Sequence, residues 1–431
     1  MQQGADLLAP PLPSPASIGL PQFSAYYPGQ DQAVQTILDA WEQCQADGVR
    51  RVVALCAPTS FGKSLLSAAV HQITKARTAH LTETKALQAQ LMGDFEGIGL
   101  VEIKGQNSYQ CIESGDGVFN LVSVDDGPCH GGYKCPVKAD CHYYGEALPA
   151  AQDASYLTPN YAYWMAQHEY GGGIGDVAEE GGPPPYPFDI LFCDEADTVF
   201  DSLTSFMAVS VTEADAKQYC GQSLPGRDGA DIGHLQWWAS EVKGAVYSKF
   251  NALSAMAEKG AVLSLPQRRQ WRRLRGLVRD IRLLVDAEGD WVCTWSGSGS
   301  WRTVTAQPVW PTGYLERYLY LDVPLVVLMS ATLSEREAVR LSADRPMQYR
   351  DYPSRIPIAD RRVIPLKMTA MSRGKANYTE WVGRIDNWIG ARLDRRLLLD
   401  TVSYDRAEAF VRMRRWRDEG ILITHRAKGI E

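Results

Sequence analysis

One short segment constrains the fold more than any other part of this chain. Residues 57–64 read Ala-Pro-Thr-Ser-Phe-Gly-Lys-Ser and lie between a β-branched apolar run, 51–56, and a segment with helical spacing, 64–73. A turn from a buried strand into a helix places backbone N–H groups where they can bind phosphate oxygens. The alternative is an ordinary strand-to-helix turn. The candidate phosphate-binding residues are Ala57, Pro58, Thr59, Ser60, Phe61, Gly62, Lys63 and Ser64.

The order of apolar runs and helical segments predicts the fold class. Short apolar runs alternate with segments of helical spacing, and such alternation is typical of a parallel sheet with crossover helices. The expected strands are 51–56, 78–81, 189–193, 325–329 and 397–400. The expected helices are 31–46, 64–73, 85–92 and 267–286. The fold class is therefore α/β, with a parallel sheet of the type found in phosphate-loop (P-loop) NTPases.

Two further motifs follow expected strands. Asp194-Glu195-Ala196-Asp197 comes after the strand 189–193, where a carboxylate can hold Mg²⁺ beside a phosphate loop. Lys63 would then contact the β and γ phosphates, Ser64 and Asp194 would bind Mg²⁺, and Glu195 would polarise the attacking water. The alternative for the acidic motif is a solvated helix start. Ser330-Ala331-Thr332 follows the strand 325–329, and alone it is also consistent with a helix cap.

Four of the nine cysteines form a cluster in the sequence. Cys111, Cys129, Cys135 and Cys141 are separated by 17, 5 and 5 residues, in a segment rich in glycine and aspartate. Four thiolates suit a tetrahedral Zn²⁺ or a [4Fe–4S] cluster, and the absence of Cys-x-x-Cys pairs weakens the zinc assignment. Free thiols are the third alternative. The remaining five cysteines are expected to be packing or surface residues.

Composition places the chain among ordinary globular proteins. Hydrophobic residues make up 45% and charged residues 22%, and the net charge is −7, so a protein that coats DNA non-specifically is disfavoured. The longest apolar run, near 323–329, is too short to span a membrane, and no signal peptide is evident. We therefore expect a cytoplasmic protein that makes no contact with a membrane. Residues 1–21 are expected to be a disordered lead-in.

Together, the motifs resemble those of superfamily 2 helicases. The loop at 57–64, the Asp-Glu-Ala-Asp box and the segment at 329–333 resemble motifs I, II and III, which implies that Ser330 and Thr332 couple hydrolysis to movement. The segment at 27–30 resembles the adenine-reading element, with Gln30 as the candidate. Residues that resemble nucleic-acid contacts of motifs Ia and IV are Thr82, Thr84, Lys85, Thr401, Ser403 and Tyr404.

The position of the four cysteines narrows the resemblance to the XPD/DinG-like iron–sulfur DNA helicases. In that family a four-cysteine [4Fe–4S] module lies between motifs Ia and II, and Cys135-Pro136 and Asn160-Tyr161 also resemble it. The chain departs from the family at Ser60, which replaces a glycine, at the bulky Phe61, and at Asp197, which replaces a histidine. After the lead-in (1–21), the resemblance implies RecA-like lobe one (22–104, 151–200 and 321–354) and an incomplete RecA-like lobe two (355–431). It also implies two insertions, which are the cluster module (105–150) and a mainly helical arch insertion (201–320).

The arch insertion contains an arginine-rich helical segment. Seven arginines lie between residues 268 and 282, and they either contact a phosphate backbone or form the solvated face of an amphipathic helix. The sequence alone does not decide between these two interpretations. The tryptophans of the insertion are expected mainly in its core.

The resemblance implies an enzyme that couples Mg-ATP hydrolysis to 5′→3′ movement on single-stranded DNA and unwinds forked or bubble duplexes. Motifs V and VI do not follow motif IV, and the arginine finger they carry contributes about 10³–10⁵ in rate. We therefore expect the chain to bind ATP and DNA, with another chain or segment supplying the rest of lobe two. The alternatives are a non-motor nucleic-acid-binding scaffold and a zinc-containing RNA helicase.

Overall fold

The computed structural model describes residues 12–113, 122–127, 129, 135–170, 188–226, 231–261, 263–354, 357 and 378–391. The chain divides into two compact units, Met1–Arg355 and Ile356–Glu431. In the second unit the described element is helix α11 (Tyr378–Gly390). The expected strand 397–400 and most of the expected lobe two lie outside the described residues. Among the described helices, none is long and apolar enough to cross a membrane.

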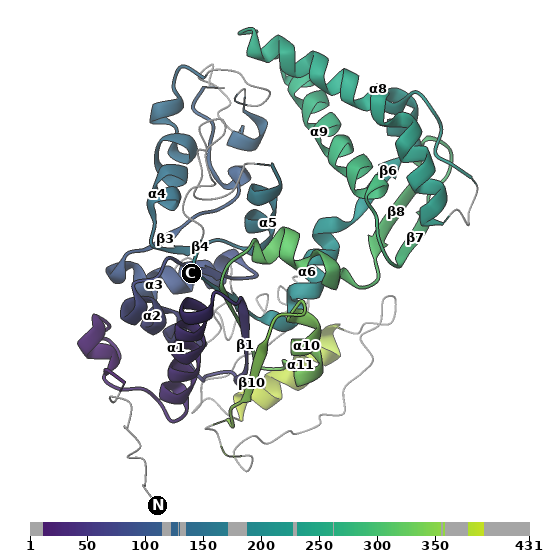
Figure 1. Cartoon of the computed structure of the whole chain (residues 1–431). Helices are drawn as coiled ribbons and strands as arrows, with labels where there is room; N and C mark the ends of the chain where they lie inside the picture. Colours follow the sequence, from purple (N-terminus) through teal and green to yellow (C-terminus); the bar gives the residue numbers. More distant parts are fainter. Residues whose placement is uncertain are drawn as a thin grey trace, which may run out of the picture. The chain divides into compact units, whose positions relative to one another are not determined.

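A seven-stranded parallel sheet forms the centre of the first unit (Figure 1). Its strand order is β10-β1-β9-β5-β2-β4-β3, so the strands that precede the three motifs, β1, β9 and β5, are neighbours. Their side chains are apolar on both faces, as expected for a parallel sheet covered on both sides. The strands are β1 (Arg51–Cys56), β2 (Thr78–Leu81), β3 (Leu100–Glu102), β4 (Tyr156–Thr158), β5 (Ile190–Asp194), β9 (Leu325–Ser330) and β10 (Met347–Asp351). The α/β class predicted from the sequence is confirmed.

Two apolar layers cover the sheet. Alternate residues of β1 point to opposite faces: Val53 and Leu55 lie in one core, and Val52 and Ala54 in the other. The first core contains helices α1 (Gln30–Asp47), α2 (Lys63–Thr74) and α3 (Lys85–Phe95) (Figure 1). The second contains α5 (Tyr161–Tyr170), α6 (Val199–Met207) and α10 (Glu335–Leu341). The four parallel pairings around β1, β9, β5 and β2 therefore hold the three motifs on one rigid layer.

The segment with the four cysteines has little regular structure. Its described part consists of short turns, held by backbone hydrogen bonds such as Cys111 N to Val122 O at 2.9 Å and Val124 N to Tyr109 O at 2.9 Å. Tyr143 is buried against Tyr109 at the centre of these turns. The elements are η3 (Gln106–Ser108), η4 (Val124–Asp126), η6 (Lys138–Asp140), the π-helical turn η7 (His142–Ala147) and α4 (Leu148–Asp153).

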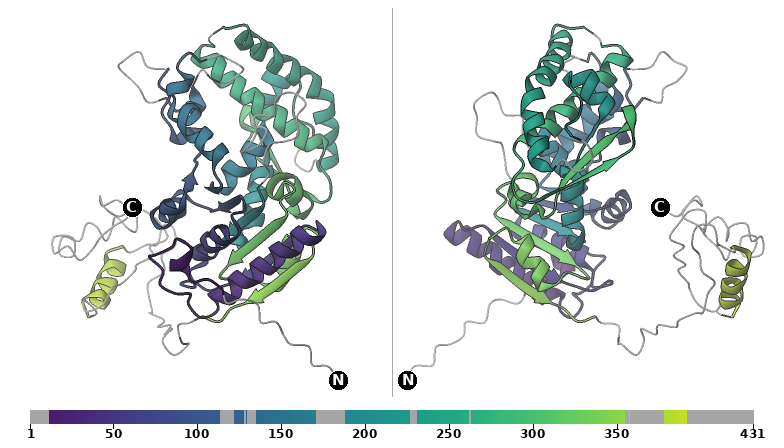
Figure 2. Two further views of the ribbon diagram at one scale, coloured as in Figure 1. Left: turned by 60° about the vertical axis from the view of Figure 1, so that its left-hand side comes forward. Right: turned by 90° about the vertical axis from the view of Figure 1, so that its right-hand side faces the viewer.

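The insertion after β5 contains a helical hairpin and a small sheet. Helices α8 (Ile232–Glu258) and α9 (Leu265–Val285) pack side by side (Figures 1 and 2). Strands β6 (Val209–Thr212), β7 (Trp291–Ser296) and β8 (Thr303–Pro308) form an antiparallel sheet in the order β6-β8-β7. The mainly helical insertion is confirmed, but the sheet was not predicted. Shorter elements here are η8 (Ala196–Thr198), α7 (Glu213–Asp215), η9 (Ala216–Cys220), η10 (Gly299–Trp301), η11 (Pro311–Tyr314) and η12 (Glu316–Tyr320).

The expected disordered lead-in is wrong for its second half. Residues Pro15–Ile18 form the short helix η1, with the Ser14 side chain accepting a hydrogen bond from Ser17 N. Leu20 is fully buried in the same core as α1 and α2. The proline-rich composition suggested disorder, but Leu20, together with Leu12 and Ile18 of the same segment, packs against the core and orders the chain there. Residues 1–11 lie outside the described part of the chain.

Candidate nucleotide and nucleic-acid site

The phosphate loop connects β1 to α2 at the carboxyl edge of the sheet. Ala57 N donates to Ser330 O at 2.8 Å, which ties the start of the loop to the end of β9. Gly62 has a φ of 79°, and a Cβ there would lie 2.5 Å from Gln30 Nε2, so this position requires glycine. Ser60 has a φ of 68°, in the left-handed region that favours glycine. The departure from the family at Ser60 therefore has a physical consequence, which is backbone strain in the loop.

Gln30 contacts the loop in this structure. Its side chain is buried; Nε2 donates to Phe61 O at 2.6 Å, and Oε1 accepts from Tyr27 N at 2.7 Å. The ring of Phe61 packs against Tyr352, with centroids 5.1 Å apart. The amide of Gln30 thus holds the loop backbone, and the adenine contact that the resemblance implies stays a prediction.

A cavity of about 230 Å³ lies beside Gln30 and the loop. It is lined on one side by the segment that precedes α1, including Phe23 and Tyr27, and on the other by Ser64 and by Asp94 of α3. Aromatic rings together with polar side chains at the start of a phosphate-loop helix suit a planar, polar ring such as a nucleobase. The cavity is the candidate base site.

Lys63 and the acidic motif come together although they are 132 residues apart. Lys63 Nζ lies 3.2 Å from Glu195 Oε1 and 3.9 Å from Asp194 Oδ1. Glu195 has a φ of 49°, a strained conformation for a residue with a side chain, and such strain often occurs at functional positions. The three residues predicted to be catalytic are therefore neighbours in the structure.

Asp194 is placed to receive a cation. Its side chain is buried, and Oδ1 has no hydrogen-bond partner in the part of the chain that the structure describes. Burial raises the pKa of this carboxyl, and Lys63 opposes the shift. The main chain at Asp194 is fixed by Tyr161, whose hydroxyl donates to Asp194 O at 2.8 Å. A buried carboxylate oxygen with an open coordination position fits Mg²⁺, which takes one or two carboxylates and completes its shell with phosphates and water.

Asp197 links the second motif to the third. Ser330 Oγ donates to Asp197 Oδ1 at 2.6 Å, and Thr332 Oγ1 donates to Asp197 Oδ2 at 2.6 Å. Burial raises the pKa of Asp197, but these two hydrogen bonds outweigh it, and the net pKa lies below the ordinary 3.8. The residues predicted to couple hydrolysis to movement are thus joined to the acidic motif by a side chain for which sequence reasoning assigned no role.

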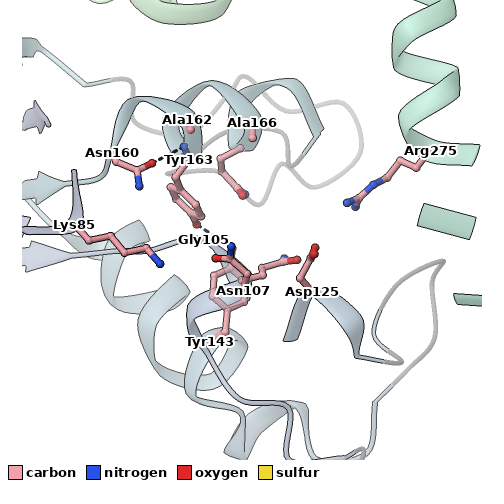
Figure 3. A pocket seen from close by; sticks show the side chains of 12 residues that line it. Lys85, Gly105, Asn107, Asp125, Tyr143, Asn160, Ala162, Tyr163, Ala166 and Arg275 are labelled. Carbon is pink, nitrogen blue, oxygen red and sulfur yellow. Dashed lines mark hydrogen bonds between the residues drawn. The ribbon is translucent and has the colours of Figure 1, made fainter. Parts of the chain in front are cut away.

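A second cavity, of about 370 Å³, lies between the start of α3, the four-cysteine segment, α5 and α9 (Figure 3). Lys85 points into it from the start of α3, and Arg275 faces it from α9. Asn107, Asn160 and Tyr163 supply amides and an aromatic ring, and Tyr163 N donates to Asn160 Oδ1 at 2.8 Å. Cations, amides and an aromatic ring together suit a nucleic-acid strand.

The three predicted motif Ia contacts have different environments. Lys85 is exposed at the second cavity, although its Nζ donates to Ser108 Oγ at 2.7 Å. Thr84 is exposed and caps α3 by accepting a hydrogen bond from Leu87 N. Thr82 is fully buried, and its hydroxyl donates to Thr84 O. In this conformation the side chain of Thr82 is not accessible to a nucleic-acid strand, and its role in nucleic-acid binding stays a prediction. Thr401, Ser403 and Tyr404 lie outside the described residues.

The arginines of α9 are largely engaged within the protein. Arg273 pairs with Asp215 at 2.5 Å, and Arg279 pairs with Asp280 at 3.2 Å. Arg272 pairs with both Asp125 and Asp126 of the four-cysteine segment. The apolar side of the helix is buried, as the amphipathic interpretation requires, and the polar side mainly binds neighbouring segments. Arg275 is the arginine of this helix that lines the second cavity.

The four clustered cysteines affect one another. Cys111 and Cys141 are buried, and Cys129 and Cys135 are half-buried. Burial raises the pKa of Cys129 to about 12, helped by the proximity of Cys135, Cys111 and Cys141 in that order. Among the described residues, no group of three or more His, Cys, Asp or Glu side chains is arranged to hold a metal ion. The thiols are thus near one another without forming a closed metal site.

Comparisons with known proteins give a similarity of structure only. No family model and no curated protein matches the sequence. Among solved structures, one named XPD helicase is similar over 89% of this chain and 74% of its own, at 15% identity and a TM-score of 0.45. A truncated XPD covers 75% of this chain and 99% of its own, at 17% identity and a TM-score of 0.43. An apo XPD covers 88% and 71%, at 14% identity and a TM-score of 0.42.

Proposed function

We propose that this chain is the motor part of an ATP-dependent DNA helicase of the XPD/DinG-like iron–sulfur type. The observation that carries the proposal is that Lys63 Nζ lies within 3.9 Å of a carboxylate oxygen of both Asp194 and Glu195, at the carboxyl edge of the sheet. Phosphoryl transfer needs a cation on the phosphates, a carboxylate for Mg²⁺ and a carboxylate that orients water. The resemblance alone gives the 5′→3′ direction.

Each residue then has a chemical role. Lys63 Nζ would leave Glu195 and bind the β and γ phosphates, because phosphate oxygens carry more charge than one carboxylate. Ser64 and Asp194 would hold Mg²⁺, and this ion would neutralise charge on the transferred phosphoryl group. Glu195, released from Lys63, would orient the attacking water and accept its proton. Asp197, bound to Ser330 and Thr332, would transmit changes at the phosphates to β9.

Nucleic acid would bind at the second cavity. Lys85 and Arg275 would contact phosphates from opposite sides, and Tyr163 would stack on a base. Single-stranded DNA fits this cavity better than a duplex, because stacking requires an unpaired base. Forked or bubble DNA supplies such strands beside a duplex.

A [4Fe–4S] cluster on Cys111, Cys129, Cys135 and Cys141 forms part of the proposal. The proximity that raises the Cys129 pKa supports it, and four thiolates are the ligand set such a cluster takes. When bound, the cluster would cross-link a segment with little regular structure. Anaerobic purification with iron, sulfide and zinc analysis tests this: four irons and four sulfides per chain support it. One zinc per chain would favour the zinc-containing helicase. A protein with no iron and no zinc would contradict both assignments.

Nucleotide binding and hydrolysis test the motor. We expect Lys63→Ala to abolish Mg-ATP binding, and Glu195→Gln to retain binding but lose DNA-stimulated hydrolysis. Lys75→Ala is the matched control, because Lys75 is an exposed lysine at the other end of the same helix. The second candidate function, a non-motor scaffold, is favoured by the strained Ser60. DNA binding that is unaffected by ATP and by Lys63→Ala would support the scaffold and contradict the motor.

A further inference from the structure

A hydroxyl group is buried beneath the phosphate loop at the centre of a hydrogen-bonded cluster. Ser67, one turn along α2 from Ser64, is fully buried, as are His80 on β2 and Tyr156 on β4. Ser67 Oγ lies 2.6 Å from His80 Nδ1, 2.7 Å from Tyr156 Oη and 3.0 Å from Ser64 O. Three elements therefore meet at one oxygen atom.

The hydrogen bonds of this cluster can be assigned by counting donors and acceptors. A serine hydroxyl has one proton and two lone pairs. Ser64 O is a carbonyl, so Ser67 donates its proton there. The lone pairs of Ser67 then accept from the Tyr156 hydroxyl and from an N–H at His80 Nδ1. All three bonding positions of Ser67 are thus occupied, which is expected for a buried hydroxyl.

This assignment fixes the state of His80. With the proton on Nδ1, Nε2 carries a lone pair, and it has no hydrogen-bond partner among the described residues. Burial and the charge of Lys63 lower the pKa of His80 to about 3, so the ring stays neutral at ordinary pH. The rings also pack tightly: His71 stacks on Tyr156 with centroids 4.7 Å apart, and His80 stacks on Phe192 at 6.1 Å.

The bond from Ser67 reaches the main chain of a residue with an assigned role. Ser64 follows Lys63 at the start of α2, and its carbonyl is the one that Ser67 holds. The strand that carries His80 is paired directly with β5, with His80 opposite Phe192, two residues before Asp194. The cluster therefore fixes Ser64 relative to the strand that carries the buried carboxylate.

We propose that Ser67, His80 and Tyr156 are positioning residues that set the distance between Ser64 and Asp194 for a divalent cation. The inference depends on the proposed nucleotide site, and it adds three residues to it. None of the three touches the cation; they act through the backbone of Ser64. A role in packing alone is the competing explanation, since all three side chains are in the core.

Magnesium-dependent nucleotide binding separates the two explanations. The affinity of the full chain for ATP is measured by calorimetry with MgCl₂ and with EDTA, and the ratio gives the gain due to the metal. We expect Tyr156→Phe and Ser67→Ala to reduce this gain by roughly two- to tenfold, the factor for one hydrogen bond. The metal-free affinity should stay unchanged. His80→Asn, which keeps a donor near the Nδ1 position, should retain most of the gain.

Two further variants make the test specific. Ser64→Ala should remove the gain, and adding Tyr156→Phe to it should have no further effect, because the cluster acts only through Ser64. Thr74→Val is the matched control: its hydroxyl bonds to Val70 O at 2.8 Å on the same helix, away from the loop. This variant should lower thermal stability and leave the gain unchanged.

The outcomes are distinguishable. The cluster has only a packing role if wild type shows the gain due to magnesium and Tyr156→Phe and Ser67→Ala keep it. The same conclusion follows if these variants lower the affinities with MgCl₂ and with EDTA by the same factor. If wild type shows no gain from magnesium, the proposed nucleotide site itself fails, and the positioning role fails with it.

Discussion

Removing the Asp197 carboxylate should uncouple two motifs that lie 133 residues apart. Asp197 accepts one hydrogen bond from Ser330 and one from Thr332, both at 2.6 Å. Ser330 is fully buried on β9, whereas Thr332 and Asp197 are exposed. Substitution Asp197→Ala removes both bonds and leaves the Ser330 hydroxyl without its acceptor.

The expected loss of stability follows from these environments. A hydrogen bond to a charged group contributes about 1.5–3 kcal/mol when it is protected from water. Because Asp197 is exposed, the contribution of each hydrogen bond is smaller than this range, and exposed charge pairs contribute about 0–1 kcal/mol. We therefore expect about 1–2 kcal/mol for Asp197→Ala, with most of it from the bond to buried Ser330. Asp197→Asn keeps one acceptor oxygen and should lose about half as much.

A double-mutant cycle measures the two bonds separately. Urea unfolding of wild type, Asp197→Ala, Ser330→Ala and the double variant gives the interaction energy for one pair, and Thr332→Val gives the other. We expect about 1 kcal/mol for the Ser330 pair and less for the exposed Thr332 pair. An interaction energy near zero for both pairs would refute the link between the motifs.

The pH dependence gives an independent check. The folded pKa of Asp197 lies below 3.8, so the folded state favours the ionised carboxylate. Its contribution is therefore present at neutral pH and is lost as the pH falls below 3.8 through the folded pKa. The stability difference between wild type and Asp197→Ala should shrink in that range. A difference that persists in acid would mean that packing, and not the charge-assisted bonds, is responsible.

Three other predictions concern the loop and α9. Ser60→Gly should relieve the strain of the left-handed backbone and tighten ATP binding in a direct binding assay. The free energy of unfolding should change by less than about 1 kcal/mol, because glycine also gives the unfolded chain more freedom. Gln30→Ala should leave the buried carbonyl of Phe61 without its donor, lower the unfolding free energy by about 1–3 kcal/mol, and increase hydrogen exchange in the loop. Unchanged exchange would contradict the anchoring role. Arg272→Ala should increase hydrogen exchange around Asp125 and Asp126 and lower the free energy of unfolding by less than about 1 kcal/mol. High salt should increase the same exchange in wild type. Equal exchange in variant and wild type would show that this ion pair does not hold the two segments together.

The parts of the fold that could be predicted are those with local signals. The strand ending at Cys56, the glycine at 62 and the helix after it form one continuous pattern, and its structure follows from local backbone preferences. Asp194 and Glu195 follow a buried strand for the same reason. Their proximity to Lys63 could be inferred because parallel strands end at a common edge of the sheet.

The small sheet in the insertion after β5 could not be predicted in this way. Strand β7 alternates half-buried and exposed residues, but it contains Trp, Cys, Thr and Ser in place of a strong apolar run. Its partner β8 is interrupted by Ala306 and Gln307, and β6 lies about 90 residues earlier in the sequence. Pairing over that distance depends on the hairpin between them, and no local pattern reports it.

The side chains whose contacts could not be predicted have polar groups whose partners lie far away in the sequence. An arginine on α9 looks the same in the sequence whether it meets DNA or an aspartate, and Arg268 donates to Asp126 O across 142 residues. Gln30 likewise has an amide suited to adenine, but in this structure its Nε2 donates a hydrogen bond to Phe61 O, 31 residues away in the sequence. A long polar side chain can serve several partners at similar energy, so the fold decides which one it meets. A role assigned to such a residue from its motif therefore needs the geometry of its neighbours, whereas Gly62 is fixed by the backbone alone.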